Sequence, residues 1–215
     1  MRRLIANIQG INMAIILLCT FLLFGAGCMN VRGSESINTA AVSKDQFLHR
    51  KLAILPVKLV QDQGGQYSSD SLISIRVALN EKLDAELKKK LSNSTIISAN
   101  TSADILNGKD KLGTLDDLTK AYSSTGFFDK RVVASLSSML QSDYIVFPWL
   151  RAQKMSVGFL GKGFGASLEV MIIDKNGETV WGGVGEYKRG GIYGFGSTDN
   201  KAAAEELIGL ALEKF

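Results

Sequence analysis

The amino-acid sequence predicts an α/β fold in which a mixed β-sheet is covered by helices. Short apolar runs, typical of buried strands, alternate with segments whose apolar residues recur every three or four positions, as on one face of a helix. An Asn176-Gly177 pair lies between two strand-like runs, which is the strongest short-range indication of a β-hairpin. The predicted order of elements is β-α-β-α-β-β-β-α.

The N-terminal half of this fold begins with an apolar run over residues 51–57, interpreted as a buried strand with Pro56 near its exit. A long helix is predicted to follow a loop over residues 61–69. Its apolar residues form one stripe: Leu72, Ile75, Leu79, Leu83, Leu87 and Leu91. A second short strand is expected at residues 95–98.

The C-terminal half is expected to add helices and a meander of strands. Residues 114–122 indicate a short helix, Gly126 interrupts the pattern, and Asp129 is a candidate N-cap for a further helix. A third buried strand over residues 144–149 is predicted to end at Pro148. Extended segments at 150–159, 164–172 and 179–187 follow, and a last helix is expected over residues 201–215.

Composition excludes several classes of protein. The chain has 215 residues, of which 46% are hydrophobic and 21% charged, as in a globular protein. Its net charge is +4, and without Arg2 and Arg3 the remainder from residue 28 carries only +2, which is too little for a typical nucleic-acid binder. Two cysteines and one histidine exclude a disulfide scaffold, a thiolate metal cage and a zinc site built on several imidazoles.

The first 27 residues have the pattern of an export signal. Arg2 and Arg3 precede an apolar run over residues 13–24, and three small residues, 25–27, lead to Cys28. The apolar run has about 12 residues, whereas a helix needs about 20 to cross a bilayer. The pattern therefore favours a cleaved signal over a permanent transmembrane anchor.

The residues before Cys28 resemble a bacterial lipoprotein lipobox. Ala26, Gly27 and Cys28 match that pattern, whereas Gly25 stands where leucine is usual. The resemblance implies cleavage between Gly27 and Cys28 and acylation of Cys28, for example with palmitate. This covalent lipid is the only non-protein group expected. The alternative is an ordinary secretory signal with an incidental cysteine.

The resemblance also implies a location and a domain organisation. Met29 follows the cysteine where aspartate would imply retention at the inner membrane, so the enterobacterial sorting rule implies the periplasmic face of the outer membrane. Residues 28–46 are polar and lack apolar periodicity, and they are interpreted as the acylated cysteine and a flexible tether. Residues 47–215 are expected to form a single periplasmic domain.

Three segments of the predicted domain resemble a known family. They are Leu-Ala-Ile-Leu-Pro-Val at 52–57, Ser-Asp-Tyr-Ile-Val at 142–146 and the run from Leu168 to Trp181. Together they resemble the curli secretion channel family (CsgG-like lipoproteins), and they are similar to the TolB amino-terminal domain and to LpoB-type activators of cell-wall synthases. The resemblance implies a mixed-sheet α/β fold, self-association and an envelope protein partner.

Two glycine-rich segments, 155–165 and 188–197, match the regions that form membrane-crossing hairpins in the curli channel. A hairpin that crosses a bilayer needs about twenty residues or more, so neither segment is long enough alone and pore formation is not expected. The segments are interpreted as sheet-edge loops or, alternatively, as a membrane or subunit contact. The candidate contact residues are Phe159, Leu160, Phe164, Ile192, Tyr193 and Phe195.

The sequence contains no recognisable catalytic set. Residues 158–165 lack the spacing of a phosphate-binding loop, and His49 lies beside the predicted tether, away from any nucleophile motif. We therefore expect a non-enzymatic, oligomeric scaffold or assembly component of an envelope export or surface machine. The alternative is a regulatory module that activates an envelope enzyme, as LpoB-type proteins do.

Overall fold

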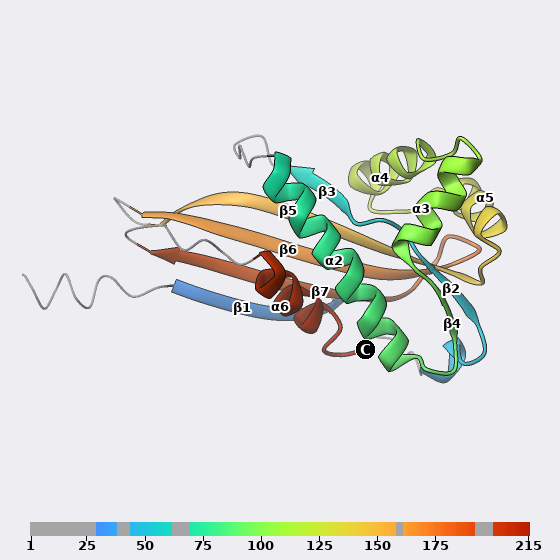
Figure 1. Cartoon of the computed structure of the whole chain (residues 1–215), viewed down its shortest axis with the longest axis horizontal. Helices are drawn as coiled ribbons and strands as arrows, with labels where there is room; N and C mark the ends of the chain where they lie inside the picture. The colour runs from blue at the N-terminus through green and yellow to red at the C-terminus, as the bar shows by residue number, and fades with distance from the viewer. Residues whose placement is uncertain (1–28, 38–43, 62–68, 158–160, 192–199) are drawn as a thin grey trace, which may run out of the picture.

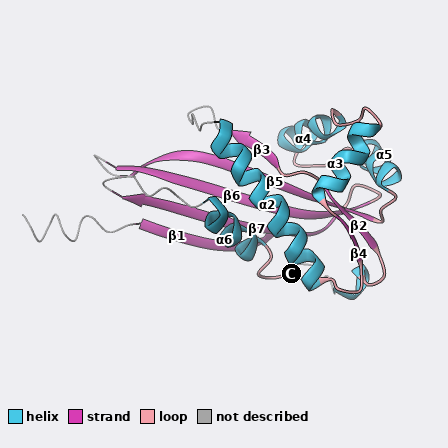
Figure 2. Ribbon diagram, viewed as in Figure 1, coloured by secondary structure: helices cyan, strands magenta, loops and turns pink. Residues whose placement is uncertain are grey.

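The computed structural model describes residues 29–37, 44–61, 69–157, 161–191 and 200–215. Within them, one mixed sheet carries helices on both faces, which confirms the predicted fold class (Figures 1 and 2). The strands are β1 (Met29–Ile37), β2 (Lys51–Ile54), β3 (Lys58–Gln61), β4 (Thr95–Ile97), β5 (Tyr144–Val157), β6 (Gly161–Asp174) and β7 (Thr179–Gly191). The helices are η1 (Lys44–Phe47, a 3-10 helix), α2 (Ser69–Lys90), α3 (Ala99–Gly108), α4 (Thr114–Thr125), α5 (Lys130–Leu140) and α6 (Asn200–Ala211).

The sheet has a parallel part and an antiparallel part. Among the described residues the strand order is β1-β7-β6-β5-β2-β4, and β3 also pairs with β5. β2 pairs in parallel with β4 and β5, and β3 pairs in parallel with β5. β5, β6, β7 and β1 form an antiparallel series. β5 therefore joins the two parts.

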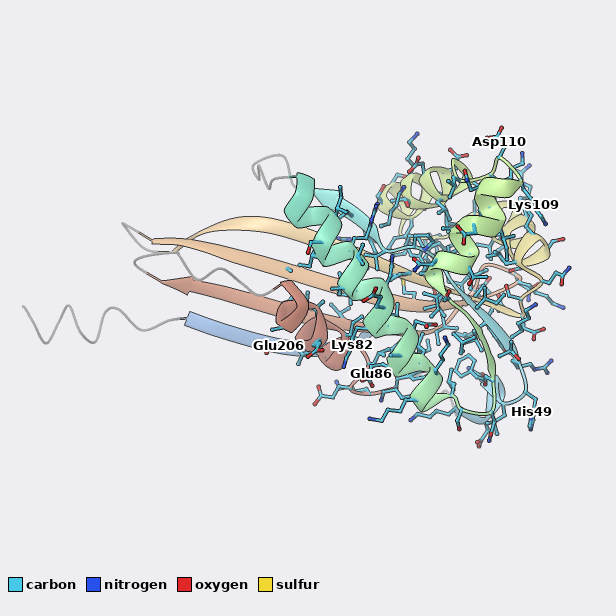
Figure 3. All side chains as sticks on the ribbon, in the orientation of Figure 1. His49, Lys82, Glu86, Lys109, Asp110 and Glu206 are labelled. Carbon is cyan, nitrogen blue, oxygen red and sulfur yellow. The ribbon has the colours of Figure 1, made fainter. Side chains whose placement is uncertain are left out.

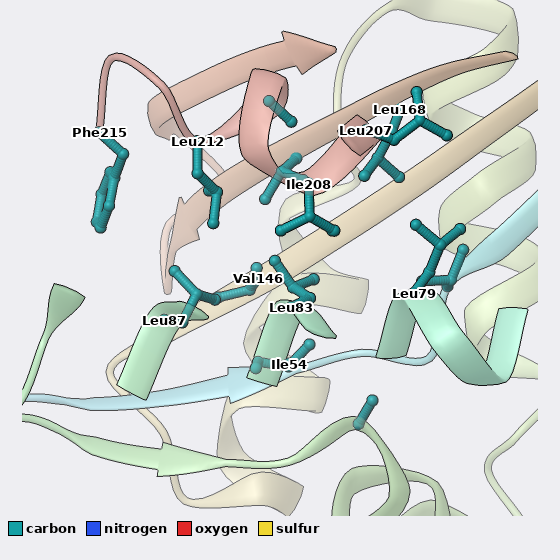
Figure 4. Close-up of a cluster of buried hydrophobic side chains, with 14 of the residues drawn as sticks. Ile54, Leu79, Leu83, Leu87, Val146, Leu168, Leu207, Ile208, Leu212 and Phe215 are labelled. Atoms are coloured by element: carbon teal, nitrogen blue, oxygen red, sulfur yellow. The ribbon is translucent and has the colours of Figure 1, made fainter. Parts of the chain in front are cut away.

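Two apolar cores hold the helices on the sheet. Alternate residues of β5 face opposite sides: Val146 and Leu150 belong to one core, and Ile145 and Phe147 to the other. The first core lies between the sheet and helices α2 and α6 (Figure 4). The second lies between the sheet and helices α3, α4 and α5. Burial on both faces explains why the first half of β5, from Tyr144 to Leu150, is continuously apolar rather than alternating.

The predicted stripe on α2 is confirmed where the side chains are described. Its buried members are Ile75, Leu79, Leu83, Leu87 and, just beyond the helix, Leu91. Full burial of an aliphatic side chain contributes about 1.5–3 kcal/mol, so this stripe supplies much of the attachment of α2 to the sheet.

The ends of α4 and α5 follow from local sequence. Gly126 ends α4 in the left-handed conformation, with φ of 72°. Asp129 caps α5, since its carboxylate accepts hydrogen bonds from the backbone N–H groups of Arg131 and Val132. Both features agree with the sequence-based expectation. Helix α3 was not predicted, although Ser98 caps it by accepting a hydrogen bond from the N–H of Thr101.

The β6–β7 hairpin turns at the predicted Asn176-Gly177 pair. Gly177 has φ of 81°, a conformation that glycine adopts without steric cost. One carboxylate oxygen of Asp174 accepts hydrogen bonds from the backbone N–H groups of Asn176 and Glu178. The Asp174 carboxylate therefore stabilises the turn.

The prediction that Pro148 ends the third strand is wrong, because β5 continues through it. The backbone N–H of Leu55 donates to the carbonyl of Val146, and alternate residues of a strand direct their polar groups to the same side. The nitrogen of Pro148 therefore faces the interval where β2 has ended at Ile54 and β3 has not yet begun at Lys58. Because no described strand pairs with β5 on that side at that point, the missing N–H of Pro148 removes no hydrogen bond from the sheet.

The prediction of a flexible tether over residues 28–46 is also wrong for residues 29–37. These residues form β1, which pairs with β7 from Met29↔Gly190 to Ile37↔Gly182. The remainder of the expected tether either lies outside the described residues or forms the start of η1. The predicted domain start at residue 47 therefore places an edge strand outside the domain.

Candidate functional site

The antiparallel strands extend past α2 and α6 at one end of the molecule (Figure 1). β5 ends there, β6 begins there, β7 ends there and β1 begins there. We call this region the free end of the sheet and define it as residues 29–32, 152–157, 161–166 and 187–191.

The free end brings together features that are far apart in the sequence. Phe164 of β6 pairs with Arg189 of β7, so the described parts of segments 155–165 and 188–197 lie side by side. Met29 pairs with Gly190. The residue that follows Cys28 therefore also belongs to this end.

The predicted site residues are placed as follows. Phe164 belongs to β6, where its backbone stands opposite Lys154 as well as Arg189. The others lie outside the described residues: Gly27, Cys28, Phe159, Leu160, Ile192, Tyr193 and Phe195. Their assignment to lipidation, or to membrane or subunit contact, stays a prediction.

The interpretation of the two segments as sheet-edge loops is wrong for their described residues. Residues 155–157 and 161–165 are paired to each other as the ends of β5 and β6, and residues 188–191 belong to β7. β5 and β6 each have 14 residues and pair over their whole length. The segments are thus continuations of long strands.

Two strand edges are open at the free end, within the described part of the chain. β1 is the last strand on its side of the sheet and pairs only with β7. On the other side, the pairing of β3 with β5 stops at Gln61↔Ala152. Among the residues that the structure describes, 153–157 of β5 therefore pair with β6 alone. Open edges present unpaired N–H and C=O groups that favour pairing with another chain.

A polar cluster lies where β5 and β6 leave the second core. The guanidinium Nη2 of Arg151 is 3.5 Å from Oε1 of Glu169, and the Tyr122 hydroxyl donates to Oε2 of Glu169 at 3.3 Å. The same guanidinium lies 4.5 Å from the centre of the Trp149 ring, a cation–π distance. The cluster joins α4, which carries Tyr122, to the two strands that form the hairpin of the free end.

Burial raises the pKa of Tyr122 to about 12, and the negative charge and hydrogen bond of Glu169 add to the effect. The phenol therefore remains protonated and donates its hydrogen bond at neutral pH. The ring is stacked on Phe128, with centroids 4.6 Å apart, and meets Trp149 edge to face at 4.7 Å. This aromatic packing orients the hydroxyl toward Glu169.

A second polar contact joins α4 to the sheet. Lys58 of β3 forms an ion pair with Asp116 in the first turn of α4. The hydrogen bond and positive charge of Lys58 lower the pKa of the Asp116 carboxyl. Both groups are partly exposed, so solvent screens the pair and its contribution to stability is small.

Neither His49 nor a metal-binding cluster of the described residues lies at the free end. His49 is exposed, in a turn at the end of the molecule opposite the free end (Figure 3). Within the described residues no group of three or more His, Cys, Asp or Glu side chains is placed to share a metal ion. Trp149 and Trp181 are buried in the two cores.

Among the described helices, none is both long enough and apolar enough to span a bilayer.

Comparison with known proteins identifies no family for this chain. No family model matches it, and no curated protein matches it. Solved structures with a similar arrangement include the PelC dodecamer from Paraburkholderia phytofirmans, with 12% identity, a TM-score of 0.43 and coverage of 83% of this chain and 92% of that chain. Lipoprotein GNA1162 from Neisseria meningitidis has 12% identity, a TM-score of 0.35 and coverage of 72% and 92%.

The C-terminal domain of LpoB from Salmonella enterica is a third such structure. It has 12% identity and a TM-score of 0.36, with coverage of 65% of this chain and 83% of that domain. At this level of similarity the matches assign no activity, partner or assembly to the chain.

The sequence interpretation did not single out the basic residues of the free end. They include Lys154, Lys162, Lys188 and Arg189, and they are dispersed along the chain. The predicted hairpin could have indicated this grouping. Counting residues outward from Gly177 along β6 and β7 predicts that Lys162 lies opposite a residue near 191. The observed partner is Gly191, one residue from the count, and the register shifts after Ile172. Residues at equal distances from a hairpin turn are cross-strand neighbours.

Proposed function

We propose that this chain is an outer-membrane lipoprotein, anchored by acyl chains on Cys28 and facing the periplasm. In this proposal it acts without catalysis, as an oligomeric scaffold or assembly component of an envelope export or surface machine. The observation that carries the proposal is the position of β1. This strand begins at the residue after Cys28, and it forms one of two open edges at the free end.

The position of β1 supports a short attachment to the membrane. Acyl chains on Cys28 would be separated from the sheet by a single peptide bond, since Met29 already pairs with Gly190. Several acyl chains at about 0.8 kcal/mol per buried CH2 anchor a protein stably. The body would therefore stay at the membrane surface, which suits a component that assembles there.

The two open edges support self-association. The edge at β1 and the edge at residues 153–157 of β5 are different surfaces, so pairing one with the other joins copies head to tail. Contacts of this kind generate closed rings when the rotation between copies is a simple fraction of a turn. Backbone pairing along the edges would tolerate the polar composition of β1.

Acylation is tested by metabolic labelling with a clickable palmitate analogue. We expect label on the mature chain and sedimentation with outer membranes. Cys28→Ser should lose both, whereas Cys19→Ser should lose neither, because Cys19 is expected to leave with the signal. A soluble, unlabelled mature chain would overturn the proposed anchor.

Edge pairing is tested by disulfide cross-linking in membranes. The acylated chain would have no free thiol, so an introduced pair reports only the designed contact. A chain with Ser34→Cys and Gln153→Cys should give a ladder of covalent oligomers on oxidation, while either substitution alone should give dimers at most.

The matched control places both cysteines away from the two edges. Lys120→Cys with Lys175→Cys, at exposed positions on α4 and in the β6–β7 turn, should give no ladder. A strictly monomeric chain in detergent, with no ladder from the edge pair, would contradict the scaffold and favour a regulatory module that activates an envelope enzyme.

A further inference from the structure

We propose that the free end of the sheet is an anionic-lipid contact, in which five basic residues face phospholipid headgroups beside the acyl anchor. The proposal deepens the proposed function, on which it rests for the orientation of the chain at the membrane. The five residues are Arg32, Lys154, Lys162, Lys188 and Arg189. They come from all four strands of the free end.

Strand register places these residues in one small region. Arg189 stands between Asn30 of β1 and Phe164 of β6, and Phe164 in turn pairs with Lys154 of β5. Paired strands are about 4.8 Å apart, so the backbone positions of Arg189 and Lys154 are separated by about 10 Å. Four residues that are far apart along the chain thus form one row across the sheet.

The remaining cations lie within two rows of this one. Lys162 is two residues from Phe164, and Arg32 pairs with Tyr187, two residues from Arg189. Because successive positions of a strand alternate between faces, the strand register assigns the positions of Arg32, Lys154, Lys162 and Arg189 to one face of the sheet. Lys188 belongs to the other face. The region is therefore basic on both sides, with most of the charge on one.

The charge of the free end differs in sign from that of the rest of the mature chain. The 188 residues from Cys28 to the C-terminus contain 23 Lys and Arg and 21 Asp and Glu. The free end holds five of those cations and no Asp or Glu. The rest therefore carries 18 cations and 21 acids, a net charge of −3, against +5 at the free end.

The position of Cys28 relates this charge to the membrane. Each residue of a strand advances about 3.3 Å, so Arg32 begins about 10 Å from Met29 along β1. That is about one Debye length at 0.1 M salt. An acylated Cys28 would hold the free end against the headgroups, within the distance at which their negative charge attracts Lys and Arg.

The experiment measures binding of the full mature chain to vesicles, with Cys28→Ser so that no acyl anchor contributes. We expect it to bind vesicles that contain phosphatidylglycerol and not to bind vesicles of phosphatidylcholine alone. High salt should dissociate the bound chain from the vesicles. Lys154→Gln, Lys162→Gln and Lys188→Gln together should weaken binding by about 100-fold, because each surface cation contributes about fivefold.

The matched control removes three lysines from other parts of the surface. Lys89→Gln, Lys111→Gln and Lys175→Gln change the net charge equally at exposed positions outside the free end, and they should change binding less than fivefold. Circular dichroism checks that both triple variants fold. Equal loss in the two triple variants would overturn the proposal, as would failure of the parent to bind phosphatidylglycerol.

The outcome is independent of the test for acylation. A chain that binds anionic vesicles through the free end but carries no palmitate would contradict the lipoprotein function and leave the lipid contact standing. A chain that carries palmitate but has no affinity for phosphatidylglycerol would contradict the lipid contact alone.

Discussion

Gly183 of β7 lies directly against the backbone carbonyl oxygen of Ala211 at the end of α6. A Cβ atom on Gly183 would overlap that oxygen and crowd the ring of Trp181. Gly185 stands in the same relationship to the carbonyl of Leu207. Because these two glycines have no side chain, the backbone of α6 packs directly against the backbone of β7. This packing covers one side of the first core next to the free end.

Gly183→Ala is expected to destabilise the chain by about 3 kcal/mol, at the upper end of the range for overpacked sites, because the obstructing atom belongs to the backbone. Urea denaturation of the purified chain measures the loss. The control is Gly209→Ala, on the exposed face of α6, where the added methyl group meets nothing within 4 Å. It should stabilise the chain by about 0.5–1 kcal/mol, since alanine favours helix over glycine. Equal effects of the two substitutions would contradict the close approach of α6.

Leu83→Ala should cost about 2–5 kcal/mol, because the Leu83 side chain is fully buried between α2 and the sheet. Val77→Ala on the same helix removes an apolar side chain that is 47% exposed and should cost far less. Equilibrium unfolding in urea compares the two variants. Comparable losses would mean that α2 is rotated about its axis relative to the structure.

The phenol of Tyr122 is expected to titrate well above the usual range of a tyrosine. Its pKa is raised to about 12, whereas an unfolded tyrosine titrates near 10. The folded state therefore holds a proton that the unfolded state releases first. The contribution of this proton to stability is complete below pH 10 and is lost as pH rises from about 10 to about 12.

Ultraviolet absorbance of the phenolate follows this titration. Tyr122→Phe should remove the late step, and Glu169→Gln should move it to lower pH, because the neighbouring negative charge is gone. A late step that persists in Tyr122→Phe would assign it to a different tyrosine.

Asp129→Ala should destabilise the chain by about 1 kcal/mol, because α5 loses the carboxylate that accepts hydrogen bonds from Arg131 and Val132. Asp129→Ser, which keeps an N-cap oxygen, should recover most of that loss. Thermal unfolding of both variants provides the comparison. If serine and alanine were equivalent at this position, the cap would contribute nothing measurable.

The sequence predicted those structural features that depend on residues close together in the chain. The α2 stripe, the Asp129 cap and the Asn176-Gly177 turn each depend on residues within a few positions of one another. Helix α3 was not predicted because its sequence is rich in Asn, Thr, Ser and Asp, which disfavour helix interiors, and because few apolar residues lie on its buried side. Leu106 packs the helix into the second core, a contact with residues that are distant in the sequence.

The elements that sequence did not predict depend on distant partners. β1 has a polar, glycine- and serine-containing sequence, and only its pairing with β7 makes it a strand. Continuity through Pro148 depends on the interval between β2 and β3 on the neighbouring side. The same holds for the free end, whose basic residues meet only when four strands align.

The pairing of β1 with β7 has a consequence for the order of folding. The β5–β6 and β6–β7 hairpins form through short loops, whereas β1 meets β7 only after a loop of roughly 150 residues has closed. Contacts of such long range form late, so β1 is expected to dock onto a nearly finished sheet. In the lipoprotein proposed above, the segment next to Cys28 would thus remain accessible to processing enzymes until the other strands of the sheet had paired.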